Sequence, residues 1–499
     1  MGSRRFRVAV VLFWLAMMAW LVRFEAFPGW FAHLVPGYRG LLPGGPVVFD
    51  SWMKVTFQDQ PIGYTHTRVD TDEKNPVEQY RVENDTLLYI NIMGEPQQIT
   101  ISAEALLDAL YSLQRFVFNM GSRRYAARIE GRRMGEKAFR VRVGSGSGGQ
   151  TIRVEIPDDV VLYSPFVELS LTRLRPGQEM RLKTLDPASL TAADVIVRAT
   201  GRETIRVRGA ATETTVLEMD FQGLEAKAWM DADGRIVRQE TPLGWVMEVC
   251  TPEEAMALQL DTQGTGADVL RAMAIPCRGE IVDPRATREL KVRLTGVSFP
   301  AADLVGDRQS VEAHGESQVD LAIRAERIPA AAAAGPYPES VLPFLKPTAY
   351  VQSDHEDILR QARAIVGERT DPVGKARAIY TWVYRKVKKA PVASLPSALD
   401  ILRQMEGDCN EHTYLFVALA RAAGLPAQIR VGLLYNEGGF YYHAWPAVYV
   451  GEWWEMDPTI GQEAVDATHI ALLEGELASQ LKLLTTIGRL NVEVLSQAH

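Results

Sequence analysis

Hydrophobic and polar residues alternate with a period of two through the first half of the chain, from about residue 49 to residue 258. Three segments show the alternation clearly: Phe139-Arg140-Val141-Arg142-Val143, Thr151-Ile152-Arg153-Val154-Glu155-Ile156 and Thr204-Ile205-Arg206-Val207-Arg208. Short alternating segments separated by turns are typical of antiparallel strands with one buried face. Asp233-Gly234 is also a typical turn of a β-hairpin. The pattern predicts an antiparallel β-rich domain over 49–260, built as a sandwich or an open barrel.

Weaker alternation continues to residue 328 and predicts a small β-module with its linker over 261–328. Pro329, five alanines and then Gly335-Pro336-Tyr337-Pro338 follow, a composition that predicts a hinge over 329–345.

After the hinge the hydrophobic period changes to 3.6, which predicts helices. Four helix starts are expected, at the capping box Ser353-Asp354-His355-Glu356, at Asp371-Pro372, at Ser397 and at Asp408, with the last helix ending at Gly424. Two or three strands are then expected, at 428–435, 440–450 and 453–456. Helices followed by antiparallel strands predict an α+β domain over 346–475, with a C-terminal tail over 476–499.

The N-terminus has the pattern of a membrane anchor. Arg4, Arg5 and Arg7 precede an uninterrupted apolar run from Val8 to Val22. No clear small-x-small cleavage site follows this run, so we expect an uncleaved single-pass helix over 1–23 rather than a signal peptide. Residues 24–48 then form a juxtamembrane linker. The positive charge before the run predicts a cytoplasmic N-terminus in the inner membrane, with the bulk of the chain periplasmic or otherwise extracytoplasmic.

The predicted fold class is therefore multidomain α+β, with a transmembrane helix, antiparallel β-rich domains and a C-terminal α+β core. The 499 residues are 47% hydrophobic and 23% charged, which is ordinary for globular domains. The formal net charge of −8 and the lack of a long basic run argue against a nucleic-acid partner. Three cysteines exclude a disulfide framework, although a bridge between Cys250 and Cys277 stays open as the less favoured alternative.

The third cysteine, Cys409, lies at a predicted helix start, in Gly407-Asp408-Cys409-Asn410-Glu411-His412. Asp408 fits the N-cap, and Glu411 three residues later completes a capping box. Unpaired backbone N–H groups and the positive end of the helix dipole favour a thiolate in the first turn. A cysteine alone more often packs as a small hydrophobic residue, so its partners decide.

Two candidate partners follow along the chain. His443 lies in a strand-like segment, and Asp457 ends the next one. If the hairpin pivots near residue 450 or 451, the two side chains face each other at about 4.5–5.5 Å between Cβ atoms. Such a pair fixes the histidine tautomer, so that the other ring nitrogen can take a proton from the thiol. Either residue alone could be structural, but the order Cys–His–Asp indicates nucleophilic catalysis.

The motifs GDCNEH, LFVALARAAGLPAQIRVGL, FYYHAW and WEMDPT together resemble the transglutaminase-like core shared with papain-type cysteine peptidases. The resemblance spans about 346–475 and implies that Cys409 is the nucleophile, His443 the acid/base and Asp457 the orienting group. It also implies a cysteine helix packed on an antiparallel sheet. One feature differs from the family pattern: members often read His-Ala-Trp-x-Glu, whereas Pro446 and Ala447 follow the tryptophan here, and a proline predicts an edge-like or bulged strand.

These residues predict an extracytoplasmic thiol enzyme that cleaves amide bonds of protein or peptide substrates, such as those of the cell envelope, through a thioester. A glutamine-crosslinking transglutaminase and a non-catalytic envelope scaffold stay open as alternatives. No calcium loop or nucleotide motif occurs, so no cofactor and no metal are expected. His412, one turn beyond Cys409, is expected on the surface of the helix rather than lining the cleft. Its i, i+4 spacing with Asp408 suits a metal, but no further ligand is evident. The oligomeric state stays open.

Overall fold

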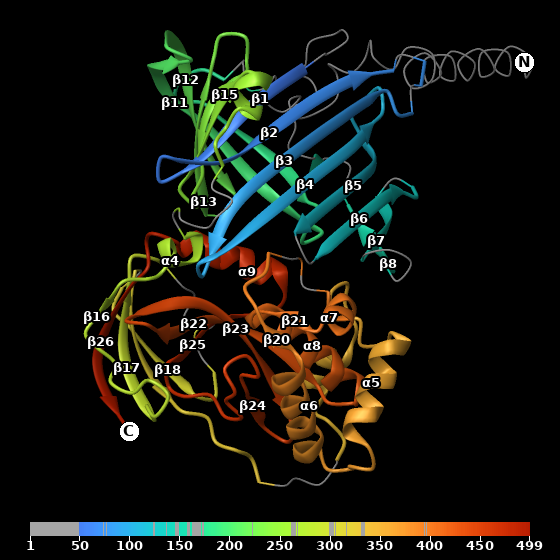
Figure 1. The fold of residues 1–499 in the computed structure, drawn as a ribbon, viewed down its shortest axis with the longest axis vertical. Coiled ribbons are helices and arrows are strands. Elements are labelled where there is room, and N and C mark those ends of the chain that lie inside the picture. The colour runs from blue at the N-terminus through green and yellow to red at the C-terminus, as the bar shows by residue number, and fades with distance from the viewer. Residues whose placement is uncertain are drawn as a thin grey trace, which may run out of the picture.

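The computed structural model describes residues 49–499, apart from short internal stretches of which 162–170 is the longest. Figure 1 shows a large curved sheet at one end of the molecule and a mixed helix-and-strand body at the other. The anchor predicted for 1–23 and the linker predicted for 24–48 lie outside the described residues.

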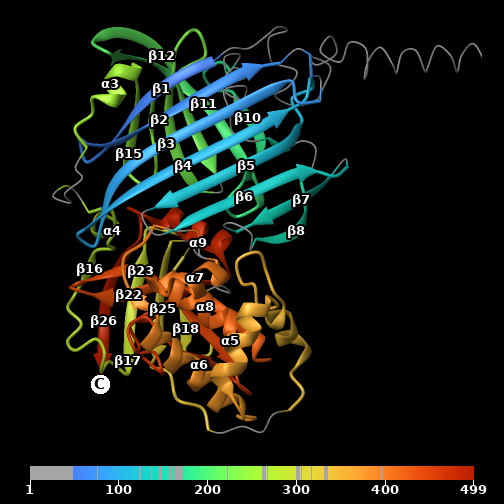
Figure 2. The same cartoon turned by 45° about the vertical axis from the view of Figure 1, so that its right-hand side comes forward.

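One sheet contains fifteen strands among the described residues, in the order β8-β7-β6-β5-β4-β3-β2-β1-β15-β14-β13-β12-β11-β10-β9. Its strands are β1 (Phe49–Phe57), β2 (Gln60–Thr71), β3 (Tyr80–Ile92), β4 (Glu95–Leu107), β5 (Leu113–Ser122), β6 (Ala126–Arg133), β7 (Ala138–Val143), β8 (Gln150–Glu155), β9 (Val160–Val161), β10 (Glu179–Asp186), β11 (Thr191–Val207), β12 (Ala210–Phe221), β13 (Leu224–Met230), β14 (Ile236–Glu240) and β15 (Trp245–Cys250). Strand β9 pairs parallel with β10, and the other neighbours pair antiparallel. The sheet curls so that its two halves form two layers, as Figure 2 shows, and β8 and β9 remain its ends. The antiparallel arrangement predicted from the alternation is confirmed, as an open curved sheet.

The period-two pattern explains which face of each strand is buried. In β7, Phe139, Val141 and Val143 are buried, whereas Arg140 and Arg142 are exposed. Successive side chains of a strand point to opposite faces, so the arginines cover the solvent side.

A second sheet of five strands has the order β16-β26-β17-β19-β18. Its strands are β16 (Cys277–Arg278), β17 (Glu289–Thr295), β18 (Gln309–Ala313), β19 (Gln318–Arg324) and β26 (Asn491–Ala498), and two short helices, α3 (Pro252–Met256) and α4 (Val269–Ala272), precede it. We call residues 277–324 together with β26 the β-module. The tail predicted for 476–499 is wrong, because this segment forms α9 (Leu477–Leu483), η6 (Leu484–Thr486) and β26, which lies between β16 and β17.

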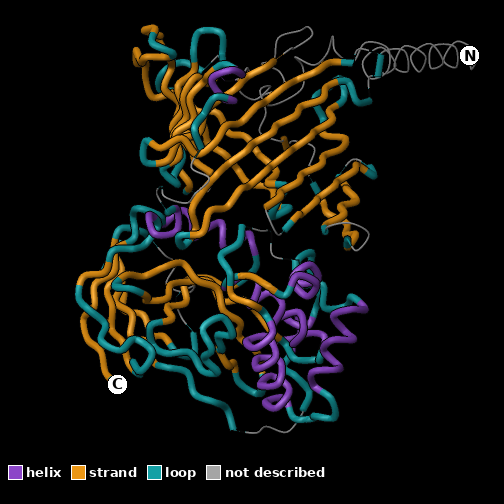
Figure 3. Tube along the Cα trace, viewed as in Figure 1, coloured by secondary structure: helices purple, strands orange, loops and turns teal. Residues whose placement is uncertain are grey.

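The helices between residues 339 and 422 gather in the body opposite the large sheet (Figure 3). They are η5 (Glu339–Leu345), α5 (Glu356–Val366), α6 (Pro372–Lys386), α7 (Ala398–Gln404) and α8 (Cys409–Ala422), and they are followed by a four-stranded sheet of order β24-β23-β22-β25. These strands are β22 (Ala427–Asn436), β23 (Gly439–Tyr449), β24 (Trp453–Glu455) and β25 (His469–Glu474), while β20 (Lys388–Lys389) pairs with β21 (Glu406–Gly407). The predicted caps Asp371, Ser397 and Asp408 are confirmed. The capping box predicted at Ser353 is wrong, since His355 caps α5 with its own ring.

Helix α8 is the centre of this body. Its residues Tyr414 to Ala420 have no exposed surface, because α5, α6 and α7 contact it on one side and β23 on the other. The arrangement implied by the family resemblance, a cysteine helix packed on an antiparallel sheet, is confirmed.

The predicted fold class is wrong for the chain as a whole. The structure is mostly β, with 50% strand and 18% helix, since the large sheet and the β-module outweigh the helical body. In the part of the chain that the structure describes, no helix is both long enough and apolar enough to cross a membrane.

The large sheet contacts the helical body directly. The Tyr125 hydroxyl donates to the carbonyl of Glu406 in β21, and the Gln97 amide donates to the Pro391 carbonyl at 3.2 Å. Near the predicted hinge, the Tyr337 hydroxyl donates to the Gly424 carbonyl at 3.0 Å, while residues 331–334 lie outside the described part. Movement at this hinge therefore stays a prediction.

All three cysteines are free thiols, so the alternative of a Cys250–Cys277 bridge is not realised.

Candidate active site

The start of α8 holds Cys409 in its first turn. Asp408 is the N-cap, and its Oδ1 accepts from the Asn410 N–H at 2.9 Å. Glu411 reaches back and accepts from the Asp408 N–H at 2.9 Å, which completes the predicted capping box. The cap fixes where the helix begins, and therefore where the thiol lies.

The first turns of α8 contact β23 beside His443. The Thr413 hydroxyl, one turn after Cys409, donates to the Ala444 carbonyl at 3.1 Å. The Cys409 thiol itself interacts with the Ala444 backbone. The nucleophile candidate therefore lies next to the immediate neighbour of the predicted acid/base.

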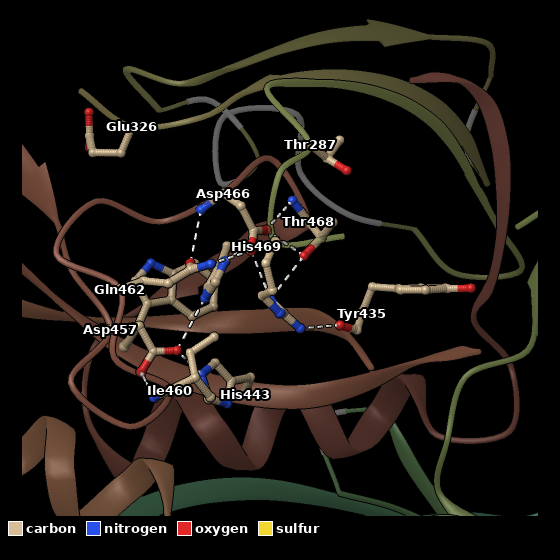
Figure 4. A network of polar contacts seen from close by, with 12 residues as sticks. Thr287, Glu326, Tyr435, His443, Asp457, Ile460, Gln462, Asp466, Thr468 and His469 are labelled. Atoms are coloured by element: carbon tan, nitrogen blue, oxygen red, sulfur yellow. Dashed lines mark hydrogen bonds and ion pairs between the residues drawn. The ribbon is translucent and has the colours of Figure 1, made fainter. Parts of the chain in front are cut away.

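His443 and Asp457 are in direct contact. The distance from His443 Nε2 to Asp457 Oδ2 is 2.7 Å, and both side chains are buried (Figure 4). The contact was predicted between facing strand residues, but β24 ends at Glu455, and Asp457 lies in the following turn, bridged to Gln462. This turn brings the carboxylate to the ring, and it leaves His443 Nδ1 as the nitrogen that can face a thiol.

The Asp457 carboxylate accepts hydrogen bonds on both oxygens. Oδ1 accepts from the backbone N–H of Thr459 at 2.7 Å and of Ile460 at 3.3 Å, while Oδ2 is also 3.2 Å from His469 Nε2. Burial opposes ionisation of Asp457, but His443 and His469 outweigh it and hold its pKa well below the usual range. Asp457 is therefore a charged acceptor at neutral pH.

The environment of Cys409 differs from the prediction that a helix start favours a thiolate. Burial, and then the neighbouring Asp408 carboxyl, raise the pKa of the Cys409 thiol well above its ordinary value. Burial and Glu411 likewise raise the pKa of Asp408. Burial therefore outweighs the effect of the helix start, and the sulfur needs a base to become a nucleophile.

Sequence comparison places this site in a known superfamily. Residues 360–458, which include Cys409, His443 and Asp457, match the Transglutaminase-like superfamily. This segment is a transglutaminase-like domain. The match supports a cysteine-dependent enzyme of that superfamily.

Individual relatives are more distant. An uncharacterized protein of Mycobacterium leprae is 25% identical over 174 residues, which are 29% of this chain and 60% of that protein. The chain thus matches less than two thirds of that relative's length. Two crystal structures are similar: a provisionally assigned cysteine protease of Cytophaga hutchinsonii (18% identity, TM-score 0.31) and the periplasmic domain of TgpA from Pseudomonas aeruginosa bound to ethylmercury (15%, TM-score 0.27). They cover 43% and 40% of this chain, and 88% of each of those chains.

The family pattern has a glutamate two residues after His-Ala-Trp, and this chain lacks it. A glutamate of the neighbouring strand faces that position instead. Ala447 stands at the position of that glutamate, and its direct cross-strand partner is Glu455. Facing residues of paired strands share one side of the sheet, and Glu455 accepts from the indole N–H of Trp445 at 2.8 Å. The edge-like or bulged strand predicted from Pro446 is not observed: β23 lies between β24 and β22, and Pro446 pairs with Ile429 of β22 in regular register. Just past the end of β24, the Pro446 carbonyl accepts from the Met456 N–H at 3.1 Å, and only the return N–H is missing.

Glu455 also joins the transglutaminase-like domain to the β-module. Its Oε2 is 2.7 Å from Arg308 Nη2, and its Oε1 is 3.4 Å from Arg430 Nε. Burial raises the pKa of Glu455, but Arg308 and Arg430 outweigh it and lower the value to about 2. All three side chains are buried, so this ion-pair network links the strand of His443, through Trp445, to the β-module.

Glu455→Gln is expected to destabilise the protein by about 3 kcal/mol, because it removes the buried carboxylate that Arg308 and Arg430 share. The matched control is Glu474→Gln, which removes a half-exposed partner of Arg430 and is expected to cost at most about 1 kcal/mol. Because the pKa of Glu455 is depressed in the folded protein, its carboxylate stabilises the fold at pH values above its ordinary pKa of 4.5. This stabilisation is lost as the pH falls toward about 2. Denaturant unfolding between pH 7 and pH 2.5 measures both effects. Equal losses in the two variants, or an equally steep acid dependence in Glu455→Gln, would contradict this role.

His412 was expected on the surface, and this prediction is wrong. The ring has no exposed area, and its Nδ1 is 2.7 Å from the carbonyl oxygen of Asp408. The Asp408 carboxylate contacts the Asn410 N–H instead, so the two side chains do not converge on a metal position.

His469 is the site residue that sequence reasoning did not assign. It lies in Ala467-Thr468-His469-Ile470, beyond the motifs that carry the family resemblance, and it is fully buried against Asp457 and Asp466 (Figure 4). The signal available in the sequence was a histidine at the start of an apolar strand, which does not reveal its contact across the sheet.

His443, Asp457 and His469 bring three potential ligand atoms within 4.8 Å of one another. Both rings direct Nε2 at the same carboxylate oxygen, Asp457 Oδ2. Two N–H donors on one acceptor account for this cluster without a metal ion.

Proposed function

We propose that this chain is a cysteine hydrolase that cleaves amide bonds of peptides or proteins through a covalent thioester. The observation that carries the proposal is the buried 2.7 Å contact between Asp457 and His443, which lies on β23, the strand that contacts α8, and Cys409 begins α8. A histidine oriented by a carboxylate next to a helix-borne thiol is the arrangement that nucleophilic catalysis requires.

The first half-reaction begins from the neutral thiol. His443 Nδ1 accepts the Cys409 proton while the sulfur attacks the amide carbonyl carbon. The Asp457 carboxylate stabilises the imidazolium that forms and keeps Nε2 protonated. When the C–N bond breaks, the imidazolium returns its proton to the departing amine, which leaves an acyl group on sulfur.

The second half-reaction consumes water. His443 takes a proton from water, the oxygen attacks the thioester carbon, and the C–S bond breaks with the proton returning to sulfur. The Cys409 backbone N–H is directed out of the first turn of α8 and can stabilise the carbonyl oxygen in both steps.

The acceptor distinguishes this proposal from its alternatives, since an amine in place of water would give a transglutaminase. Incubation of the purified protein with a mixed peptide library and a labelled primary amine, read by mass spectrometry, is expected to give cleaved peptides with free carboxyl ends and no incorporated label. Incorporated label would show that the acyl group is transferred to amines, and the chain would then be a transglutaminase rather than a hydrolase. Peptides that remain unchanged, with no acyl group on Cys409, would refute catalysis and favour a scaffold.

Substrates of the cell envelope are part of the proposal, and so is a location outside the cytoplasm. Both depend on the basic and apolar N-terminal sequence, which lies outside the described residues. Cleavage of envelope proteins in extracts treated with the purified chain would support this location.

A further inference from the structure

We propose that His469 is a permanently protonated positioning residue that holds Asp457 in place, and that Arg285 of the β-module supports it through Asp466. The proposal rests on the proposed function, because Asp457 orients the acid/base of that reaction.

The geometry determines how many protons the His469 ring carries. Its Nε2 is 3.2 Å from Asp457 Oδ2, and its Nδ1 is 3.4 Å from Asp466 Oδ1. A carboxylate only accepts hydrogen bonds, so both ring nitrogens must donate. A neutral imidazole has a single N–H and could satisfy only one of these carboxylates. The ring is therefore an imidazolium held between two anions.

The surrounding charges are consistent with this state. Burial lowers the pKa of His469, but the Asp466 and Asp457 carboxylates outweigh burial and raise it. The other titratable or charged groups nearby are His443, whose ring centroid is 5.8 Å away, and Arg308, which donates to the His469 carbonyl at 3.2 Å and is paired with Glu455. Asp457, His469, Asp466 and the partly exposed Arg285 alternate in sign, so the row of four groups is neutral overall.

Asp466 transmits the support of the β-module. Its Oδ2 pairs with Arg285 Nη1 at 2.8 Å and accepts from the Gln462 amide at 2.6 Å, while Oδ1 accepts from the Thr468 N–H at 2.7 Å. Arg285 lies between β16 and β17 of the β-module, and its Nη2 also donates to the Tyr435 carbonyl. The position of Asp457 thus depends on a residue outside the transglutaminase-like match, which gives the β-module a role in the site.

His443 and His469 donate to the same oxygen of Asp457. When His469 holds one side of that oxygen, the remaining direction is fixed for His443. Loss of His469 frees the carboxylate to shift, and a misplacement of about 1 Å in a catalytic group can cost about 100-fold in rate. Loss of the positive charge also makes the protonated site harder to deprotonate, so the acid limb of activity moves to higher pH.

The first test needs no catalysis. In ¹⁵N-histidine NMR spectra of the full chain at pH 7.5, His469 is expected to show two protonated ring nitrogens, and His443 one. The assignments come from signals lost in His469→Gln and His443→Gln. A neutral His469 ring, with only one protonated nitrogen, would overturn the proposal whether or not the protein is an enzyme.

The second test compares two arginine variants of the β-module. Arg285 and Arg293 each pair with a buried aspartate at 2.8 Å and are exposed to a similar degree, 35% and 33%. Arg285→Gln is expected to slow alkylation of Cys409 by iodoacetamide about 10-fold, and His469→Gln about 100-fold with a higher acid limb. Arg293→Gln is expected to stay within about twofold of the wild type. Equal rates in Arg285→Gln, His469→Gln and the wild type would overturn the positioning role. A wild-type Cys409 no more reactive than Cys277 would instead refute the proposed function, leaving the NMR result to decide the state of His469.

Discussion

Replacement of Cys409 by alanine is expected to lower amide hydrolysis by about 10⁴-fold or more, to the background of the assay. The variant keeps the cap of α8 and the His443–Asp457 contact, but it has no atom that can form the acyl bond. Cys409→Ser is expected to be nearly as inactive, because a hydroxyl is a far weaker acid than a thiol and this site already disfavours the anion. Initial rates on a peptide substrate found by the library experiment give the comparison.

The other two cysteines provide matched controls. Cys250 is buried in β15 and Cys277 is partly buried in β16, outside the transglutaminase-like match. Cys277→Ala is expected to keep activity within about twofold, and Cys250→Ala to lower stability but not the rate of the folded protein. Activity that survives Cys409→Ala would exclude this residue as the nucleophile.

Asp457→Asn is expected to lower activity by about 100-fold to 10⁴-fold, although an asparagine side chain has nearly the same shape as an aspartate side chain. The Asp457 carboxylate accepts from His443 and His469 on one oxygen and from the Thr459 and Ile460 N–H groups on the other. An amide has a single acceptor oxygen, so in either orientation its NH₂ group faces N–H donors. The mismatch should also destabilise the fold by about 1–3 kcal/mol.

Asp320→Asn is the control that distinguishes a loss of catalysis in Asp457→Asn from a loss of stability. Asp320 is a buried aspartate of the β-module paired with Arg293, so its replacement should lower the melting temperature without changing the rate per folded molecule. Thermal melts and initial rates of both variants give the comparison. If Asp457→Asn loses no more activity than Asp320→Asn at equal stability, Asp457 is structural and not catalytic.

Local patterns in the sequence predict much of the site. The N-cap Asp408 and the capping Glu411 fix the start of α8 within a few residues of Cys409, and these signals need no distant contact. The alternation of apolar and polar residues likewise predicts the strands of the large sheet, because one face of each strand must be buried.

Contacts between distant segments explain what the sequence does not predict. His469 begins β25, which pairs with β22 at the opposite edge of the sheet from β24, and Asp457 lies in the turn after β24, so no local pattern indicates that the two side chains meet. In the same way, β26 joins β17 across nearly 200 residues of chain, so a local pattern shows a tail where the fold has a central strand. The raised pKa of Cys409 also depends on burial, which the helix start alone does not indicate.

The most direct measurement is the alkylation rate of each cysteine by iodoacetamide at pH 7, followed by mass spectrometry in the wild type and in His443→Ala. If the thiol, the imidazole and the carboxylate act together, Cys409 reacts at least about 10-fold faster than the partly exposed Cys277 in the wild type, and His443→Ala removes this advantage while leaving Cys277 unchanged. A Cys409 that reacts no faster than Cys277, or that reacts equally fast without His443, would contradict a catalytic role for these three residues.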